Sequence, residues 1–544
     1  MNRRFKQTAA TCLDSYKLGH ADQYAPGTKY VFSNFTPRSD RLFSGKKNSN
    51  YDGKIVVAGI RMFITEMHYL FKETFFDVPV EEAISEFEEI CSSFGSIDKM
   101  KTRLIQLHKL GKLPLIIRGL PEGSAVKPGI PVLFITNTDE DFYWLPNFLE
   151  TWISSELWKC MTSATTARLY RKILNKFVIE TGSSPEFANW QIHDFSLRGQ
   201  GGIKDGANSG VGHLMFSNGA DNIPAAKMIR DVYGDDVSSF AGSVPASEHS
   251  TSSSNILVNA SKGLSLEEAE SEFFKRYITE IYPSGICSYV ADTYDYWGLL
   301  TEILPKNKEE ILSRDGKVVI RPDSGDPVRI ICGYRIINQE NIKSPFQLIA
   351  DKIEVIKDDE NYYLIGGFDQ YDNPVKKEIP WYEALGSIRV LAKIFGKTMN
   401  EKKYFTVNPK VGLIYGDSIT LERCQEILER LAEMKYAADN IVFGVGSYTY
   451  QYVTRDTFGF AIKATWVQCE EGSYSIYKDP KTDGGTKKSA KGLLRVVKDE
   501  NGEYELLQDQ EKAGYDETVV YYMEGVMPVI ESFSKVKQRA MESV

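Results

Sequence analysis

The chain has 544 residues, 42% of them hydrophobic and 12% aromatic, which is typical of a folded protein with two or three domains. Its 65 basic and 74 acidic residues give a formal charge of -9, which argues against nonspecific binding to nucleic acid but allows a local basic pocket. No apolar run is long enough to span a bilayer, and residues 1–7 lack the apolar core of a signal peptide. Seven scattered cysteines without CxxC spacing predict a cytoplasmic location, unpaired thiols and no zinc site.

Residues 1–155 mix predicted strands and helices. Alternating apolar residues predict a strand over 30–35, and two further apolar runs predict strands over 115–118 and 131–135. An apolar, aromatic stretch over 144–158 predicts a helix. This first part of the chain is therefore expected to be an N-terminal α/β region.

From about residue 190 the chain changes to a repeated pattern. Six short apolar runs each end at a charged or glycine-flanked residue, and a loop follows. The runs are 190–192, 287–291, 318–320, 411–415, 440–443 and 460–463. Such runs predict strands that are buried on both faces. We favour a β/α barrel over 156–467, although an open doubly wound sheet would produce the same local pattern.

Two segments depart from this pattern. Residues 352–378 are expected to form a surface insertion, with a hairpin around 358–361, and a helix is expected over 381–395. Residues 478–492 predict a basic loop, which is either a solvated surface loop or a loop over a polyphosphate.

Polar residues at the strand ends and loops form a candidate site. In a parallel barrel, the rim at the carboxyl ends of the strands carries the chemistry. Arginines bind phosphates through paired hydrogen bonds, and carboxylates bind Mg²⁺ and ribose hydroxyls. The set therefore suits a sugar phosphate that carries a pyrophosphate. Its members are Arg198, Arg321, Arg455, Lys463, Asp292, Asp323, Asp417 and His249.

Histidine is scarce, with six in the chain, and His193 and His249 lie among polar residues. A lone histidine is more often structural than catalytic, but Glu248 and Ser250 flank His249 and could set its tautomer and pKa. The glycine-rich segment 199–206 is a weak phosphate signal. Metalloprotease, Walker A and nucleophile-elbow patterns are missing from the sequence.

In combination, these motifs resemble those of the type II phosphoribosyltransferases of the nicotinate and nicotinamide family. The matching segments run in one order from residue 14 to about 492. They are Asp14-Ser15-Tyr16-Lys17, Asn137-Thr138-Asp139, His193-Asp194-Phe195 with Arg198, Gly219-Ala220-Asp221, Pro245-Ala246-Ser247-Glu248-His249, Asp292-Thr293-Tyr294-Asp295, Arg321-Pro322-Asp323, Gly416-Asp417, Thr454-Arg455-Asp456 and Lys478-Asp479-Pro480.

The resemblance implies an irregular β/α barrel with an additional α/β domain, built from the N-terminal region and a C-terminal segment, 468–544, that packs back on it. It implies a homodimer with shared active sites, to whose interface residues 1–155 contribute. The implied reaction belongs to NAD salvage. It transfers 5-phosphoribosyl from phosphoribosyl pyrophosphate to nicotinamide and yields nicotinamide mononucleotide and pyrophosphate. Mg²⁺ is the implied cofactor, held without a dedicated protein cage, and ATP is an optional co-substrate.

The resemblance also assigns roles to residues. Phe195 and Tyr16, from different subunits, would stack on the nicotinamide ring, where Arg321 also binds, and Asp221 would accept its amide N–H. His249 would be the catalytic, transiently phosphorylated residue, with Arg321 and Asp323 beside it. Asp323, Asp417 and Asp292 would lie beside the ribose or Mg²⁺. The phosphate contacts would be Arg198, Arg38, Arg455, Lys463, Gly446, Ser447 and Lys478.

Two positions differ from the family pattern. Ser447 stands where a second glycine is common in the 5-phosphate loop, and serine tolerates fewer backbone angles than glycine. Ala461 stands where a serine is common, which leaves one phosphate hydrogen bond in question.

Three alternative functions remain open at this point. A nicotinate phosphoribosyltransferase would share the fold and chemistry, and Asp221 and Tyr16 argue against it because nicotinate carries its own carboxylate. A noncatalytic binding or signalling protein on the same scaffold would not need His249. A metal-dependent hydrolase on a barrel would need a ligand cluster with recognisable spacing.

Overall fold

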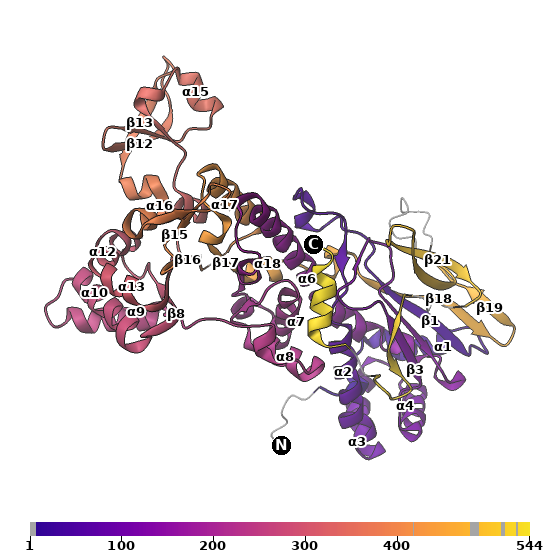
Figure 1. Cartoon of the computed structure of the whole chain (residues 1–544). Coiled ribbons are helices and arrows are strands. Elements are labelled where there is room, and N and C mark those ends of the chain that lie inside the picture. Colours follow the sequence, from indigo (N-terminus) through magenta and orange to yellow (C-terminus); the bar gives the residue numbers. More distant parts are fainter. Residues whose placement is uncertain (1–6, 417, 479–488, 513–516, 529–530) are drawn as a thin grey trace.

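The computed structural model describes residues 7–416, 418–478, 489–512, 517–528 and 531–544. Two bodies lie side by side in it, a parallel barrel and a region built on an antiparallel sheet (Figure 1). The long helix α6 (Glu150–Thr181) packs against α7 (Ile203–Leu214) of the barrel and β18 (Ala461–Cys469) of the antiparallel sheet, and most of its residues are buried. None of the described helices combines the length and the hydropathy that a membrane span needs.

The barrel contains six parallel strands in the order β7-β6-β17-β16-β9-β8. Their bounds are β6 Ile192–Asp194, β7 Gly219–Ala220, β8 Ser284–Val290, β9 Asp315–Arg321, β16 Val411–Tyr415 and β17 Val442–Val445. Two parallel bridges, Gly219 to Gly242 and Ala246 to Ser288, close the ring through the segment 242–246. The predicted barrel is therefore confirmed, and the open sheet is excluded.

Helices follow the barrel strands on the outside of the ring. They include α7 (Ile203–Leu214), α8 (Ile223–Tyr233), α9 (His249–Ala260), α10 (Leu266–Arg276), α14 (Pro327–Cys332), α16 (Trp381–Phe395), α17 (Leu421–Glu433) and α18 (Ser447–Gln451). Polar caps start several of them directly after a strand. Asn222 accepts a hydrogen bond from the N–H of Ala225 at the start of α8, and Asp326 does the same for Arg329 in α14. These caps keep the loops at the carboxyl rim short.

The second body is a six-stranded antiparallel sheet in the order β19-β18-β1-β5-β3-β22. Its strands are β1 Tyr30–Thr36, β3 Leu115–Gly119, β5 Leu133–Asn137, β18 Ala461–Cys469, β19 Gly472–Ser475 and β22 Val519–Met523. The strands predicted in the first 155 residues are confirmed. The run at 460–463 was wrongly predicted as a barrel strand, because β18 pairs antiparallel with β1. Buried and less buried residues alternate along β18 after Lys463, as expected of a sheet with one covered face.

A separate lobe projects from the barrel (Figure 1). It holds the sheet β10-β11-β12-β13 and the helix α15 (Pro345–Ala350). The strands are β10 Ile336–Asn338, β11 Val355–Asp358, β12 Asn361–Phe368 and β13 Pro374–Ile379. The predicted hairpin and the helix over 381–395 are confirmed. The lobe begins at β10, earlier than the predicted insertion limit of 352, because β10 adds a parallel strand from outside the hairpin.

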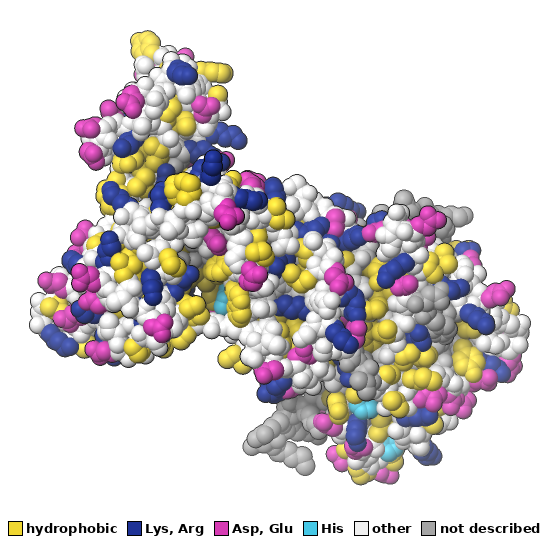
Figure 2. All heavy atoms as spheres, in the orientation of Figure 1, with side chains coloured by type: hydrophobic (Ala, Val, Ile, Leu, Met, Phe, Trp, Pro, Cys, Tyr) yellow, Lys and Arg dark blue, Asp and Glu magenta, His cyan; other side chains and the backbone are white. Residues whose placement is uncertain are grey.

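The C-terminal part returns to the antiparallel-sheet body. β20 (Leu493–Lys498) and β21 (Tyr504–Gln510) form a hairpin, and β22 pairs with β3. The last helix, α19 (Phe533–Met541), lies between the two bodies (Figure 1), where Arg539 donates to the carbonyl of Glu122 at 2.6 Å. Lysines, arginines, aspartates and glutamates are interspersed over the face shown in Figure 2.

Candidate active site

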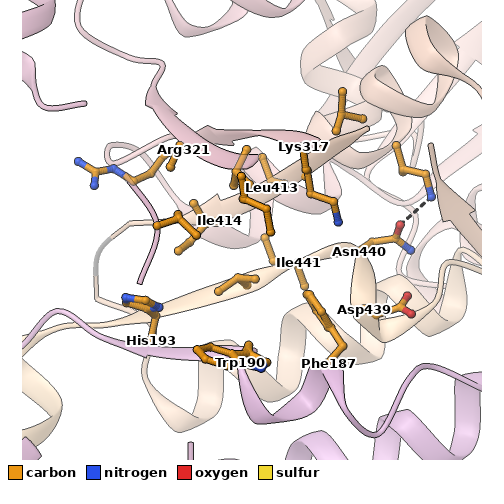
Figure 3. A pocket seen from close by; sticks show the side chains of 18 of the residues that line it. Phe187, Trp190, His193, Lys317, Arg321, Leu413, Ile414, Asp439, Asn440 and Ile441 are labelled. Carbon is orange, nitrogen blue, oxygen red and sulfur yellow. Dashed lines mark hydrogen bonds between the residues drawn. The ribbon is translucent and has the colours of Figure 1, made fainter. Parts of the chain in front are cut away.

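A cavity of about 670 Å³ lies inside the barrel and reaches its carboxyl rim. Arg321 and His193 lie at one end of it, and Lys317, Asp439 and Asn440 lie at the other (Figure 3). The wall between them is mostly apolar. A flat, apolar ring bound in this cavity would therefore be surrounded by apolar side chains, with polar groups at the mouth of the cavity.

Phe195, Asp221 and Arg321 all line this cavity, which brings together three of the residues predicted to bind the base. Phe195 follows β6, Asp221 follows β7, and Arg321 ends β9. The N–H of Asp221 donates to the carbonyl of Asp194 at 3.1 Å and continues the pairing of β7 with β6. Three different strands thus aim an aromatic ring, a carboxylate and a guanidinium into one space.

Asp221 is held in its ionised form. Burial pulls the pKa of Asp221 upward, but hydrogen bonds from His193 and Ser243 and the charge of Arg321 outweigh it and leave the pKa below its usual range. Its Oδ1 lies 2.9 Å from Nε2 of His193 and 2.5 Å from Oγ of Ser243. Asp221 can therefore only accept hydrogen bonds at neutral pH.

His249 lies on the rim between two carboxylates. It begins α9, and its Nε2 is 3.8 Å from Oδ1 of Asp292 and 3.9 Å from Oδ2 of Asp323. Its Nδ1 lies 3.2 Å from the hydroxyl of Thr293. The side chain remains 48% exposed, so an incoming phosphate can reach a ring nitrogen that acidic neighbours would orient.

Asp323 and Gly416 show how closely the rim is packed. A Cβ at Gly416 would collide with Oδ1 of Asp323, so the glycine that follows β16 leaves room for the carboxylate just beyond the end of β9. Asp417, predicted on the ribose or Mg²⁺ side, lies outside the described residues.

The predicted phosphate loop lies at the end of β17. Gly446 has φ −82° and ψ 176°, and Ser447 opens α18, so neither residue needs the left-handed conformation that favours glycine. The serine that differs from the family pattern therefore causes no backbone strain. A side chain at Gly199 would collide with Ser447, which places the exposed turn that carries Arg198 against this loop.

The remaining predicted phosphate contacts gather on the antiparallel-sheet body. Burial lowers the pKa of Lys463, and the positive charges of Arg38 and Lys478 lower it further. Arg38 donates to the carbonyl of Gly459 at 2.7 Å. Ala461, the other departure from the family pattern, pairs with Thr36 two residues before Lys463. Residues 479–488 of the basic loop lie outside the described residues.

Tyr16 belongs to this second group. Partial burial raises the pKa of Tyr16, while the charge of nearby Arg455 opposes the shift. Tyr16 is 57% exposed, and among the described residues it makes no hydrogen bond, ion pair or ring contact with Phe195 or Asp221. The structure therefore sorts the predicted residues into a rim group on the barrel and a basic group with Tyr16 on the other body.

The rim carboxylates make a partial site for a hard cation. Oδ1 of Asp292 is buried without a hydrogen-bond partner in the described part of the chain. The described residues contain no cluster of three metal-binding His, Cys, Asp or Glu side chains. Asp292 and Asp323 thus fit Mg²⁺ where substrate oxygens complete its coordination shell.

Sequence reasoning left two residues of this site unassigned. His193 was recognised as lying in a polar context, and Ser243 was not singled out. Both contact Asp221, although they come from β6 and from the irregular closing segment 242–246. In the sequence, only the position of Ser243, directly after Gly242 and shortly before the motif that ends at His249, could have pointed to this residue.

The chain is similar to known proteins along most of its length. The model of the nicotinate phosphoribosyltransferase (NAPRTase) family matches residues 190–517. A nicotinamide phosphoribosyltransferase of Acinetobacter baylyi is 39% identical over 99% of this chain and 98% of its own. One from Mycoplasma pneumoniae is 30% identical over 88% of this chain and 93% of its own.

Among solved structures, a nicotinate-nucleotide pyrophosphorylase from Pyrococcus furiosus is 15% identical and aligns with a TM-score of 0.49, covering 100% of this chain and 98% of that chain. The family match and the identity along nearly the whole length carry the assignment. The chain belongs to the nicotinate phosphoribosyltransferase family.

Proposed function

We propose that this protein is a nicotinamide phosphoribosyltransferase of NAD salvage, which transfers 5-phosphoribosyl from phosphoribosyl pyrophosphate to nicotinamide. The products are nicotinamide mononucleotide and pyrophosphate. The observation that carries the proposal is the ionised carboxylate of Asp221, which lines the same cavity as Phe195 and Arg321. The relatives named nicotinamide phosphoribosyltransferase support it.

The charge of Asp221 explains the choice of base. The amide N–H of nicotinamide can donate to this carboxylate, whereas nicotinate would place a second negative charge against it. Phe195 supplies a face for the pyridine ring, and the pyridinium product is a cation that an aromatic face stabilises further. The ring nitrogen of nicotinamide has a free lone pair, so the transfer needs no general base.

The rim accounts for the phosphoribosyl half of the substrate. Arg198 and the loop at Gly446 and Ser447 are suited to the 5-phosphate, and Arg321 to the pyrophosphate. Asp323, together with Asp292, is suited to the ribose hydroxyls. The main task of the protein is to hold the ring nitrogen close to C1 of the sugar while pyrophosphate departs.

Mg²⁺ is the proposed cofactor, with Asp292, Asp323 and Asp417 as the protein groups that would hold it. When bound with substrate, it neutralises charge on the departing pyrophosphate. ATP is a proposed optional co-substrate, and His249 is the group that would accept its phosphate. The exposure of His249 and its position between Asp292 and Asp323 support this role.

A homodimer with shared sites explains the second group of residues. Tyr16 is exposed on the antiparallel-sheet body and would complete the site on the barrel of a second copy. The basic residues of that body would meet the phosphates at the same site. They are Arg38, Arg455, Lys463 and Lys478. The seven cysteines are unpaired, which supports the proposed cytoplasmic location.

A product assay tests the proposal. The protein is incubated with phosphoribosyl pyrophosphate, Mg²⁺ and either nicotinamide or nicotinate, and the mononucleotides are separated by chromatography. We expect nicotinamide mononucleotide as the main product. Formation of nicotinate mononucleotide alone would assign the other member of the family, and formation of neither would reject the transfer.

A further inference from the structure

His193 contacts both barrel residues that we assign to the pyridine ring. Its Nε2 lies 2.9 Å from Oδ1 of Asp221, and its ring centroid lies 4.7 Å from that of Phe195 with the planes tilted by 43°. The side chain of His193 is only 10% exposed, whereas that of Asp221 is 47% exposed. A buried imidazole therefore stands behind an accessible carboxylate.

The two oxygens of Asp221 are in different situations. Oδ1 is within hydrogen-bond distance of both His193 and Ser243, whereas Oδ2 accepts no hydrogen bond from the described residues. An ionised carboxylate only accepts hydrogen bonds, so Nε2 of His193 must carry the proton and donate it to Oδ1. Oδ1 is thus occupied by the protein, and Oδ2 is left for a ligand.

Close packing fixes the imidazole in this position. A Cβ at Gly219 would come within 2.8 Å of Nδ1 of His193 and 2.9 Å of the carbonyl oxygen of Ile192. Gly219 also pairs with His193 between β7 and β6. The ring therefore lies against backbone on one side and against Phe195 on another, and it has little freedom to turn away from Asp221.

We propose that His193 is a positioning residue that selects an amide over a carboxylate at the pyridine ring. It binds Oδ1 of Asp221 and thereby directs Oδ2 toward the amide N–H of nicotinamide. Ser243 is the second donor in this arrangement. This inference rests on the proposed function and deepens it, because the selectivity assigned to Asp221 then depends on a buried neighbour that does not touch the substrate's amide.

The test is a comparison of His193→Phe with His193→Gln in the full chain. Phenylalanine keeps a ring against Phe195 and removes the donor, while glutamine can place an N–H close to the position of Nε2. We expect His193→Phe to raise KM for nicotinamide roughly tenfold, in line with the loss of one hydrogen bond to a charged group. We expect its kcat to stay within about twofold, because no reacting atom is touched.

The ratio of kcat/KM for nicotinamide to that for nicotinate is the deciding readout. His193→Phe should lower this ratio about tenfold, and His193→Gln should restore most of it. Thermal unfolding of each variant checks the fold. If His193→Phe does not fold, Ser243→Ala replaces it in the test, because this substitution at an exposed position removes the other donor to Asp221.

The outcomes separate the two proposals. A wild-type protein that forms no nicotinamide mononucleotide would reject the proposed function. If the wild type is active and folded His193→Phe keeps its ratio of kcat/KM values, only the role of His193 is overturned. Where His193→Phe does not fold, an unchanged ratio in Ser243→Ala has the same meaning. A loss of kcat with unchanged KM, not restored by glutamine, would also overturn it.

Discussion

The backbone N–H of Asp323 donates to Oδ2 of Asp292 at 2.9 Å and so ties the end of β9 to the end of β8. The hydroxyl of Ser324 donates to the same oxygen at 2.6 Å. Asp292 is 5% exposed at its side chain, and its other oxygen is buried and accepts no hydrogen bond from the described residues. One carboxylate therefore shapes the loop after β9 and presents a charge beside His249.

Substitution of Asp292 separates these two tasks. Asp292→Asn keeps an oxygen for both donors, so we expect an unfolding temperature close to that of the wild type but a kcat lowered by at least tenfold, because the charge is lost. Asp292→Ala should in addition lose about 1 kcal/mol of stability, since the part-buried N–H of Asp323 and the hydroxyl of Ser324 lose their acceptor. Kinetics and calorimetry of both variants check this, and equal stability of the two would refute the role in the loop.

Replacement of Asp221 should weaken the preference for nicotinamide. In Asp221→Asn the repulsion of the nicotinate carboxylate disappears, and we expect the ratio of kcat/KM values for the two bases to fall roughly tenfold, or about 1.4 kcal/mol. Asp231→Asn, which removes a charge from the surface of α8, is the matched control. An unchanged ratio in Asp221→Asn would sink the proposed basis of selectivity.

His249→Ala should abolish stimulation by ATP while basal transfer persists. The imidazole of His249 lies between Asp292 and Asp323 and remains accessible, which is why we propose it as the group that accepts the phosphate of ATP. Initial rates with and without ATP measure both quantities in one experiment. An equal loss of basal and stimulated rates would contradict a phosphohistidine.

Mixed dimers test whether two chains share each site. Tyr16→Ala and Phe195→Ala are each expected to be nearly inactive, because the pyridine ring loses one stacking partner in every site. Random mixing of the two variants should restore activity to about a quarter of the wild-type value, because each mixed dimer contains one intact site. Absence of any recovery after subunit exchange, verified with differently tagged chains, would argue for sites within a single chain.

Glu122 should make stability depend on pH. Burial raises the pKa of Glu122 to about 7 and outweighs the hydrogen bond from Tyr233 at 2.9 Å. Because folding raises the pKa of this carboxyl group, its contribution to the free energy of unfolding is fully present at pH values below the unfolded pKa of 4.5. The contribution is lost as the pH rises toward 7.

The expected loss from Glu122 is roughly 3 kcal/mol between these pH values. Glu122→Gln should flatten this part of the profile, which urea unfolding at a fixed protein concentration would measure. A profile that keeps the slope of the wild type would show that other groups cause it.

Local patterns in the sequence were sufficient for the strand ends of the barrel. The apolar run at 318–320 predicted a buried strand opening at Arg321 and Asp323, and β9 ends at Arg321. The motifs around Asp221 and His249 pointed to the family because they depend on residue identity and order alone. The same reasoning identified the hairpin of the lobe and the helix α16.

Pairing partners far apart in the chain were decided by the tertiary structure. The run at 460–463 looks like a barrel strand, and only its pairing with Tyr30–Thr36 places it in the other sheet. The segment 242–246 carries no strand pattern, yet its two bridges close the ring and bring Ser243 to Asp221. Residue periodicity reports which faces are buried, but not which strand lies alongside. For this reason the sequence pointed to motif residues such as Asp221 and His249, whereas Ser243 and the contacts of His193 with Asp221 and Phe195 appeared only in the folded chain.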